Sequence, residues 1–279
     1  MAQKLIQSTF NMLLGHSHIR PHRLNPRKQW PPLARSLAQQ TDQALDADQQ
    51  AAPSSKLILP EEDRVDFFRL KHLFTVEDLV DARVHLGHKD TMLNPHMRPF
   101  IFGKRLGVLV IDLDKTRDYL MKALHVVAET AYRGGIVLFV HQSRQTGFMV
   151  EETARQCGEF AFCRRWVNKA FTNSQFEFGS IVRLPDLVVM LSVLDIADSM
   201  HDAVNTSARM LIPTVGVCDT NADPTLVTYP VPGNDDTPQA IELYCRLFKI
   251  AILNGKAKRN EIVQKYGEDF YNKTLEVDE

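Results

Sequence analysis

The chain has 279 residues, which is enough for one large domain or two small ones with a hydrophobic core that needs no disulfide or metal ion for stability. Hydrophobic residues make up 44% and charged residues 24%, as in ordinary globular proteins, and the net charge is −1. No apolar run reaches the roughly 18 residues of a membrane-spanning helix, so we expect no membrane anchor. The four cysteines include no C-x-x-C pair. Their spacing excludes a zinc ribbon and a disulfide framework, and fits a reducing compartment.

The first 41 residues differ in charge from the rest of the chain. They contain six basic residues and no acid, which leaves a net charge of −7 on residues 42–279. Leu5, Ile6, Phe10 and Leu13 can share one helical face. This pattern predicts a mitochondrial transit peptide, with a basic arm that binds RNA or protein as the alternative. Residues 42–72 are predicted to be an acidic extension or linker, because residues 42–66 carry seven acids against two bases.

The pattern of a folded domain begins near Phe74. Thr75 and Asp78 can cap a helix, and a helix from about 114 to 132 should stop at Gly134 and Gly135. Helices are also predicted over residues 151–157 and 198–210, and from Pro238 to an end at Gly255. Apolar runs predict buried strands between these helices, at residues 108–111, 136–140, 187–191 and 213–217.

Apolar strands that alternate with helices indicate a parallel sheet covered on both faces. The fold class is therefore α/β, with a doubly wound, mostly parallel sheet in one domain over residues 73–255. Residues 256–279 form a charged, partly helical tail. Such a sheet binds ligands at the carboxyl ends of its strands.

The expected strand ends carry no recognisable enzyme motif. Neither a G-x-G-x-x-G nor a G-x-x-x-x-G-K-[ST] loop occurs, and there is no G-x-S-x-G elbow. Cys218 follows a strand, but a small buried side chain explains it better than a nucleophile does. Asp219, Asn221 and Asp223 resemble the start of a calcium loop, but Pro224 stands where that loop needs glycine. A turn that caps its own backbone is the better interpretation.

Two other groups of residues are candidate binding sites. His85 and His88 could face one metal ion with Asp90, although two histidines alone are a weak metal signal, so we predict no metal or other cofactor. Hydrogen bonds to RNA or to the next loop are the alternative. The second group comprises two basic clusters, the later one beside Trp166, which suit phosphates and a stacked base. An ordinary solvated face explains them equally well.

Several motifs together resemble the small-subunit ribosomal protein two family. They lie in order along residues 74–255. The motifs are residues 81–88 (DARVHLGH), 94–95 (NP), 98–103 (RPFIFG), 111–116 (IDLDKT), 165–166 (RW), 171–173 (FTN), 184–187 (LPDL), 212–214 (IPT), 219–224 (DTNADP) and 231–236 (VPGNDD).

The resemblance implies a flavodoxin-like domain without catalytic activity, which contacts small-subunit rRNA and neighbouring proteins near the mRNA path. With the basic N-terminus, it implies a mitochondrial form in the matrix, with no membrane contact and no small-molecule substrate. Bacterial relatives insert a coiled-coil hairpin where this chain has only residues 174–183, so we expect the hairpin to be absent. Asn168 and Lys169 replace the paired glycines of the family.

The predicted function is therefore a structural part of the mitochondrial small ribosomal subunit. The alternative is an α/β enzyme that binds a phosphorylated small molecule at the strand ends. The predicted rRNA-binding residues are mostly cations, with two histidines as loop organisers and Trp166 as either a stacking platform or a core anchor. They are His85, His88, Lys89, Arg98, Lys104, Arg105, Arg164, Arg165, Trp166, Lys169, Lys256, Lys258 and Arg259.

Overall fold

The central element of the fold is a five-stranded parallel sheet. A computed structural model describes residues 66–167, 170–175, 182–195 and 199–266, and the statements below concern these ranges. The strand order is β5-β4-β6-β7-β8, and each neighbouring pair is parallel. The strands are β4 (Val137–Val140), β5 (Phe160–Phe162), β6 (Leu187–Met190), β7 (Thr214–Cys218) and β8 (Tyr229–Pro232).

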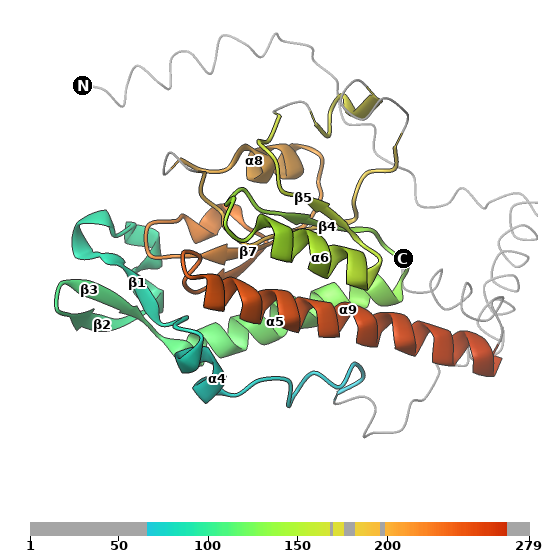
Figure 1. The fold of residues 1–279 in the computed structure, drawn as a ribbon, viewed down its shortest axis with the longest axis horizontal. Helices are drawn as coiled ribbons and strands as arrows, with labels where there is room; N and C mark the ends of the chain where they lie inside the picture. The colour runs from blue at the N-terminus through green and yellow to red at the C-terminus, as the bar shows by residue number, and fades with distance from the viewer. Residues whose placement is uncertain (1–65, 168–169, 176–181, 196–198, 267–279) are drawn as a thin grey trace, which may run out of the picture. The chain divides into compact units, whose positions relative to one another are not determined.

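Helices cover both faces of this sheet (Figure 1). Val137 and Phe139 of β4 pack in one core cluster with the helices α5 (Leu113–Tyr132), α6 (Gly147–Cys157) and α9 (Pro238–Tyr266). The intervening Leu138 and Val140 pack in a second cluster with α8 (Asp202–Arg209). Because successive strand residues point to opposite faces, two separate clusters require a sheet covered on both sides. The predicted doubly wound α/β fold is confirmed.

A second, smaller sheet corrects one prediction. The apolar run at 108–111 forms β3 (Val108–Ile111), but it lies in an antiparallel sheet of order β1-β3-β2 and not in the parallel sheet. Its partners are β1 (Leu86–Lys89) and β2 (Ile101–Arg105), two segments for which the sequence predicted no strand. Leu106 and Gly107 join β2 to β3 with φ of 51° and 82°, as a two-residue hairpin turn requires. A four-residue apolar run carries too little periodicity to show which sheet it joins.

The helix boundaries follow the sequence signals at three points. Thr75 and Asp78 form a complete capping box in front of α4 (Val76–Asp81). Gly134, just past the end of α5, has φ of +73°, and Pro238 is the first residue of α9. These residues mark helix ends because each one either pairs or removes a free backbone N–H group there, or allows the chain to turn.

Gly255 does not end α9, contrary to the prediction, and the helix continues to Tyr266. This glycine is buried against α5, where an added Cβ would collide with the carbonyl oxygen of Ala128. Its role is to let two helix backbones approach closely. At the other end of the chain, Phe68 and Leu70 are buried in the core, so packing begins within the segment interpreted as a linker.

Short 3₁₀ helices connect the remaining elements: η1 (Asp90–Met92), η2 (Pro95–Phe100) and η3 (Pro224–Leu226). Residues 1–65, the predicted transit peptide and most of the predicted linker, lie outside the described ranges, as do residues 176–181 and 267–279. In the described ranges, no helix combines the length and the apolar character that crossing a membrane requires.

Candidate nucleic-acid interface

The loops that follow β4, β6, β7 and β8 meet at the carboxyl edge of the parallel sheet. They enclose a cavity of about 230 Å³, lined by side chains such as His141, Ser192, Asn221 and Asp235, with His88 reaching in from β1. The chain winds from β4 to one side of the sheet and from β6 to the other, so this edge is the topological switch point of the fold.

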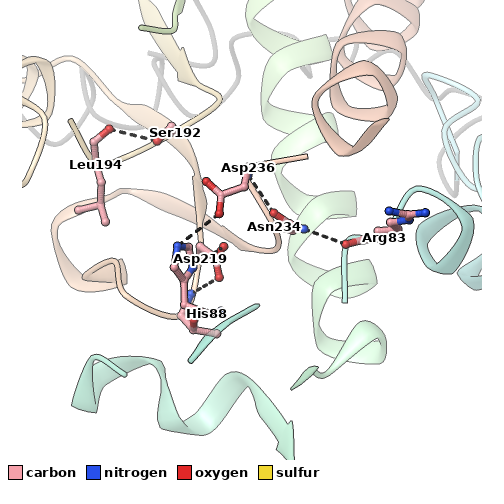
Figure 2. A network of polar contacts seen from close by, with 8 residues as sticks. Arg83, His88, Ser192, Leu194, Asp219, Asn234 and Asp236 are labelled. Atoms are coloured by element: carbon pink, nitrogen blue, oxygen red, sulfur yellow. Dashed lines mark hydrogen bonds and ion pairs between the residues drawn. The ribbon is translucent and has the colours of Figure 1, made fainter. Parts of the chain in front are cut away.

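His88 links the small sheet to this edge (Figure 2). Its Nδ1 lies 3.1 Å from Oδ2 of the buried Asp219, and its Nε2 lies 3.3 Å from Oδ2 of Asp236. Its backbone N–H donates to Oγ1 of Thr220 at 2.9 Å. The hydrogen bond with Asp219 outweighs partial burial and raises the pKa of His88 to about 9. His88 is therefore a cation at neutral pH, held between two carboxylates.

Other polar side chains of these loops organise the turns, as the sequence analysis predicted. Oδ1 of Asp223 accepts from the N–H of Thr225 at 3.0 Å, and Oδ1 of Asn234 accepts from the N–H of Asp236 at 2.9 Å. The amide of Asn234 donates to the carbonyl of Arg83 and thereby ties this turn to the N-terminal part of the domain (Figure 2). These are self-capping turns and not a calcium loop.

The structure separates the two histidines considered as a metal pair. They do not lie together at the end of a helix, because α4 ends at Asp81 and His88 lies in the strand β1. In the described part of the chain, the residues whose ligand atoms could hold an ion together are His88, Asp219 and Asp236, within 4.8 Å of one another, without His85. Asp90 instead forms an ion pair with Lys104.

Four of the predicted rRNA-binding cations gather on the small sheet and the loop that feeds it. All four are exposed, and we call them the hairpin cations: Lys89, Arg98, Lys104 and Arg105. Lys89 on β1 and Arg105 on β2 both pair with Val108 of β3, so they flank it on neighbouring strands. Residues directly opposite one another project from the same face of a sheet, which gives this face two cationic side chains.

The second basic cluster follows β5. Arg164 and Arg165 are exposed, whereas Lys169 lies outside the described residues. Trp166 is only 7% exposed, and its ring meets Phe162, Phe171 and His201 edge-on at centroid distances of 5.0–6.0 Å. These contacts favour the core-anchor interpretation of Trp166, because its faces are not open to a base.

The third predicted group has internal contacts, and we call it the α9 cations: Lys256, Lys258 and Arg259. Nζ of Lys256 lies 2.5 Å from Oε1 of Glu159 and donates to the carbonyl of Cys157 at 2.6 Å. Nζ of Lys258 lies 3.0 Å from Oε2 of Glu261 and 5.7 Å from the centroid of the Phe67 ring. Arg259 packs against Gly134, where an added Cβ would strike its guanidinium.

Comparison with known proteins decides the family. The model of the family described as Ribosomal protein S2 matches residues 79–184 and 175–255. The chain belongs to the ribosomal protein S2 family. It is 49% identical over 201 residues to small ribosomal subunit protein uS2m of Bos taurus, a match that covers 72% of this chain and 69% of the bovine protein.

Bacterial members of the S2 family match as well. Small ribosomal subunit protein uS2 of Gluconobacter oxydans is 36% identical over 220 residues, which is 65% of this chain and 83% of that protein. The protein of the same name from Rhizobium leguminosarum is 33% identical over 224 residues, which is 67% of this chain and 88% of that protein. The family resemblance read from the separate motifs is confirmed.

Two exposed apolar side chains of this S2-family domain escaped the sequence analysis. Phe102 on β2 is 80% exposed, and Leu106 in the hairpin turn is 97% exposed. Leu106 also has a positive φ, which costs a leucine about 1–2 kcal/mol. Leu106 and Gly107, which stand between two runs of β-forming residues, could have predicted this hairpin turn. The exposure of Phe102 was not predictable, because it depends on which face of the hairpin packs.

Proposed function

We propose that this chain is a structural component of the small subunit of the mitochondrial ribosome, where it binds rRNA and neighbouring proteins. The observation that carries the proposal is the 49% identity with the bovine protein named uS2m, which exceeds the 33–36% identity with the bacterial proteins named above. The acid-free, basic residues 1–41 support a mitochondrial location independently of the folded domain.

The chemistry of the strand ends does not favour the alternative of an enzyme that binds a phosphorylated molecule. The carboxylate of Asp236 lines the cavity there and would repel phosphate, whereas burial and the nearby Asp219 raise the pKa of Asp235 to about 7. Cys218 is fully buried in β7, and burial raises the pKa of its thiol, so the thiolate that a nucleophile needs is disfavoured. The geometry of this edge instead suits a structural link between β1 and the loops after β7 and β8.

For rRNA contact, we propose the hairpin cations together with Arg164 and Arg165. Their exposure leaves the charged groups accessible to phosphates, which supply most sequence-independent affinity for nucleic acid. Residues 42–279 carry a net charge of −7, so these local clusters must act against an acidic background. We therefore assign part of the attachment to protein neighbours, and we place the chain near the mRNA path by analogy with its family.

Sedimentation of the tagged chain from mitochondrial lysate tests the assembly. We expect the chain to run with small-subunit particles and to leave them when magnesium is chelated and the particles unfold. A chain that stays at the top of the gradient, while other small-subunit proteins sediment, would contradict a structural role and favour the enzyme.

A reporter fusion tests the location. Residues 1–41 fused to a fluorescent protein should direct it to mitochondria, and replacing the six basic residues with glutamine should leave it in the cytosol. If the unmodified fusion stays diffuse in the cytosol, the basic segment is an RNA-binding or protein-binding arm and not a targeting signal.

A further inference from the structure

A shallow groove lies on the helical face of the domain, between α4, α6 and α9. Its volume is about 680 Å³. Asp78, Asp81 and Ala82 line it from the region of α4, Phe148 and Glu152 from α6, and Glu242 and Arg246 from α9. Helices α6 and α9 run side by side on this face of the sheet, and both pack on the same core cluster (Figure 1).

The groove presents an apolar anchor point. Phe148 stands in the first turn of α6 and is 76% exposed, although the residues that follow it along the buried face of the helix, such as Val150 and Ala154, are fully covered. Met149 and Leu243 line the groove beside it. Together, the exposed ring and these neighbouring apolar side chains offer a partner an apolar contact site.

The charge of the groove is negative. Four carboxylates line it (Asp78, Asp81, Glu152 and Glu242), against two cations (Arg246 and Lys249). Glu152 is paired with Arg155, and Nζ of Lys249 donates to Oε1 of Gln156 at 2.5 Å but keeps its charge, so the groove has a small net negative charge. Backbone and side-chain hydrogen bonds from Thr75 lower the pKa of Asp78, so this carboxylate stays charged at neutral pH. The groove is thus apolar at one side and acidic around it.

We propose that this groove binds a basic, amphipathic segment of a neighbouring protein in the small-subunit particle; the proposal rests on the proposed function. Charge complementarity selects the occupant. The net negative charge of the groove repels rRNA phosphates and also the acidic body of a second copy of this chain. A segment rich in lysine and arginine, with an apolar residue to cover Phe148, satisfies both features of the groove.

Photocrosslinking at Phe148 tests the proposal within the assembled particle. Benzoylphenylalanine would replace Phe148 in the tagged full-length chain, and purified small-subunit particles would be irradiated and the crosslinked peptides sequenced. We expect a crosslink to one lysine-rich and arginine-rich segment of another ribosomal protein. The same label at Phe160, which is 60% exposed on the edge strand β5, serves as the control and should not reach that segment.

Charge reversal adds a second measurement. Asp81→Lys with Glu242→Lys should reduce the yield of the Phe148 crosslink about tenfold, because the new cations repel a basic segment. Asp118→Lys, at an exposed position of α5 outside the groove, should leave the yield unchanged. Circular dichroism of each purified variant checks that the fold is retained.

Several outcomes would overturn the proposal. These are a crosslink to rRNA, to a second copy of this chain or to an acidic segment, and the absence of a crosslink in particles that contain the labelled chain. A yield that survives charge reversal in a folded variant would also contradict it. If the unlabelled chain does not sediment with the particle at all, the proposed function fails first, and this inference fails with it.

Discussion

The small antiparallel sheet and the C-terminal half of α9 carry the same kind of charge in opposite situations. The hairpin cations are exposed on β1, on β2 and in η2, near Phe102 and the strained turn at Leu106, and the partner of Lys104, Asp90, is itself exposed. Among the α9 cations, Lys256 is held 2.5 Å from Glu159, whose side chain is only 5% exposed, and Lys258 is held by Glu261. We therefore expect basic residues to mark an interface where their side chains stay exposed, as in the hairpin, and not where they are partly buried against the fold, as in α9. We expect the first region to bind rRNA and the second to hold the fold together.

The largest expected effect of a substitution is on particle binding through the hairpin. Arg98→Glu with Arg105→Glu should weaken association with small-subunit particles about a hundredfold at low salt, and should lower the salt slope by about one unit for each lost phosphate contact. Thermal unfolding should change little, because exposed ion pairs contribute only about 0–1 kcal/mol. The measurement is binding to particles depleted of the native protein, across a salt series. If the salt dependence of binding is unchanged, these two arginines contact solvent and not rRNA phosphates.

Acid should destabilise the core of the domain without involving the hairpin. His141 is 2% exposed, and burial lowers its pKa to about 4 from 6.5, with His201 as a second cause. As the pH falls, the unfolded chain binds a proton at this histidine near pH 6.5, whereas the folded chain binds one only near pH 4. The free energy of unfolding therefore decreases as the pH falls from 6.5 to 4. The loss amounts to about 3 kcal/mol, at about 1.4 kcal/mol per pKa unit.

Denaturant unfolding between pH 7 and pH 4 measures this loss. His141→Gln should flatten the pH dependence, whereas His72→Gln, at an exposed position, should not change it. A wild-type stability that stays constant over this range would show that His141 is protonated in the folded state without penalty.

Gly255→Ala should destabilise the packing of α9 on α5 by about 1–3 kcal/mol. Alanine favours a helix over glycine by about 1 kcal/mol, but the atom in the way of its methyl group is a backbone oxygen of Ala128, which cannot rotate aside. The matched control is Gly103→Ala on β2, where nothing lies within 4 Å of the added Cβ. A Gly255→Ala variant as stable as the wild type would mean that the two helices separate at no cost.

Removing a cation from α9 should have a smaller effect, on stability and not on binding. Lys256→Gln takes the partner from the poorly exposed carboxylate of Glu159, which we expect to cost about 1–2 kcal/mol after allowing for the partial exposure of the lysine. Association with the particle should keep its salt slope. A reduced slope with unchanged stability would instead place Lys256 at the rRNA and remove the contrast between the two regions.

The sequence predicted the elements whose signals are local. The apolar runs at 136–140, 187–191 and 213–217 became β4, β6 and β7, and the capping residues Thr75 and Pro238 stand where they were expected. It misassigned 108–111, because membership of a sheet depends on partners elsewhere in the chain. It also misread Gly255, since glycine serves equally to end a helix and to pack two helices closely.

The candidate sites show the same limit. The ion pair between His88 and Asp219 joins residues that are distant in the sequence, and so does the pair between Lys256 and Glu159. No local sequence pattern predicts either pair. The basic character of each cluster was visible in the sequence. Which cations have internal partners became clear only once the strands and helices were placed together.

Ultraviolet crosslinking of rRNA within purified small-subunit particles tests the central contrast most directly. The peptides of this chain that carry a crosslinked nucleotide should include residues 89–105 and 164–165, and should not include residues 256–259. Nucleotides attached to the α9 cations, with none on the hairpin, would contradict the assignment of the two regions.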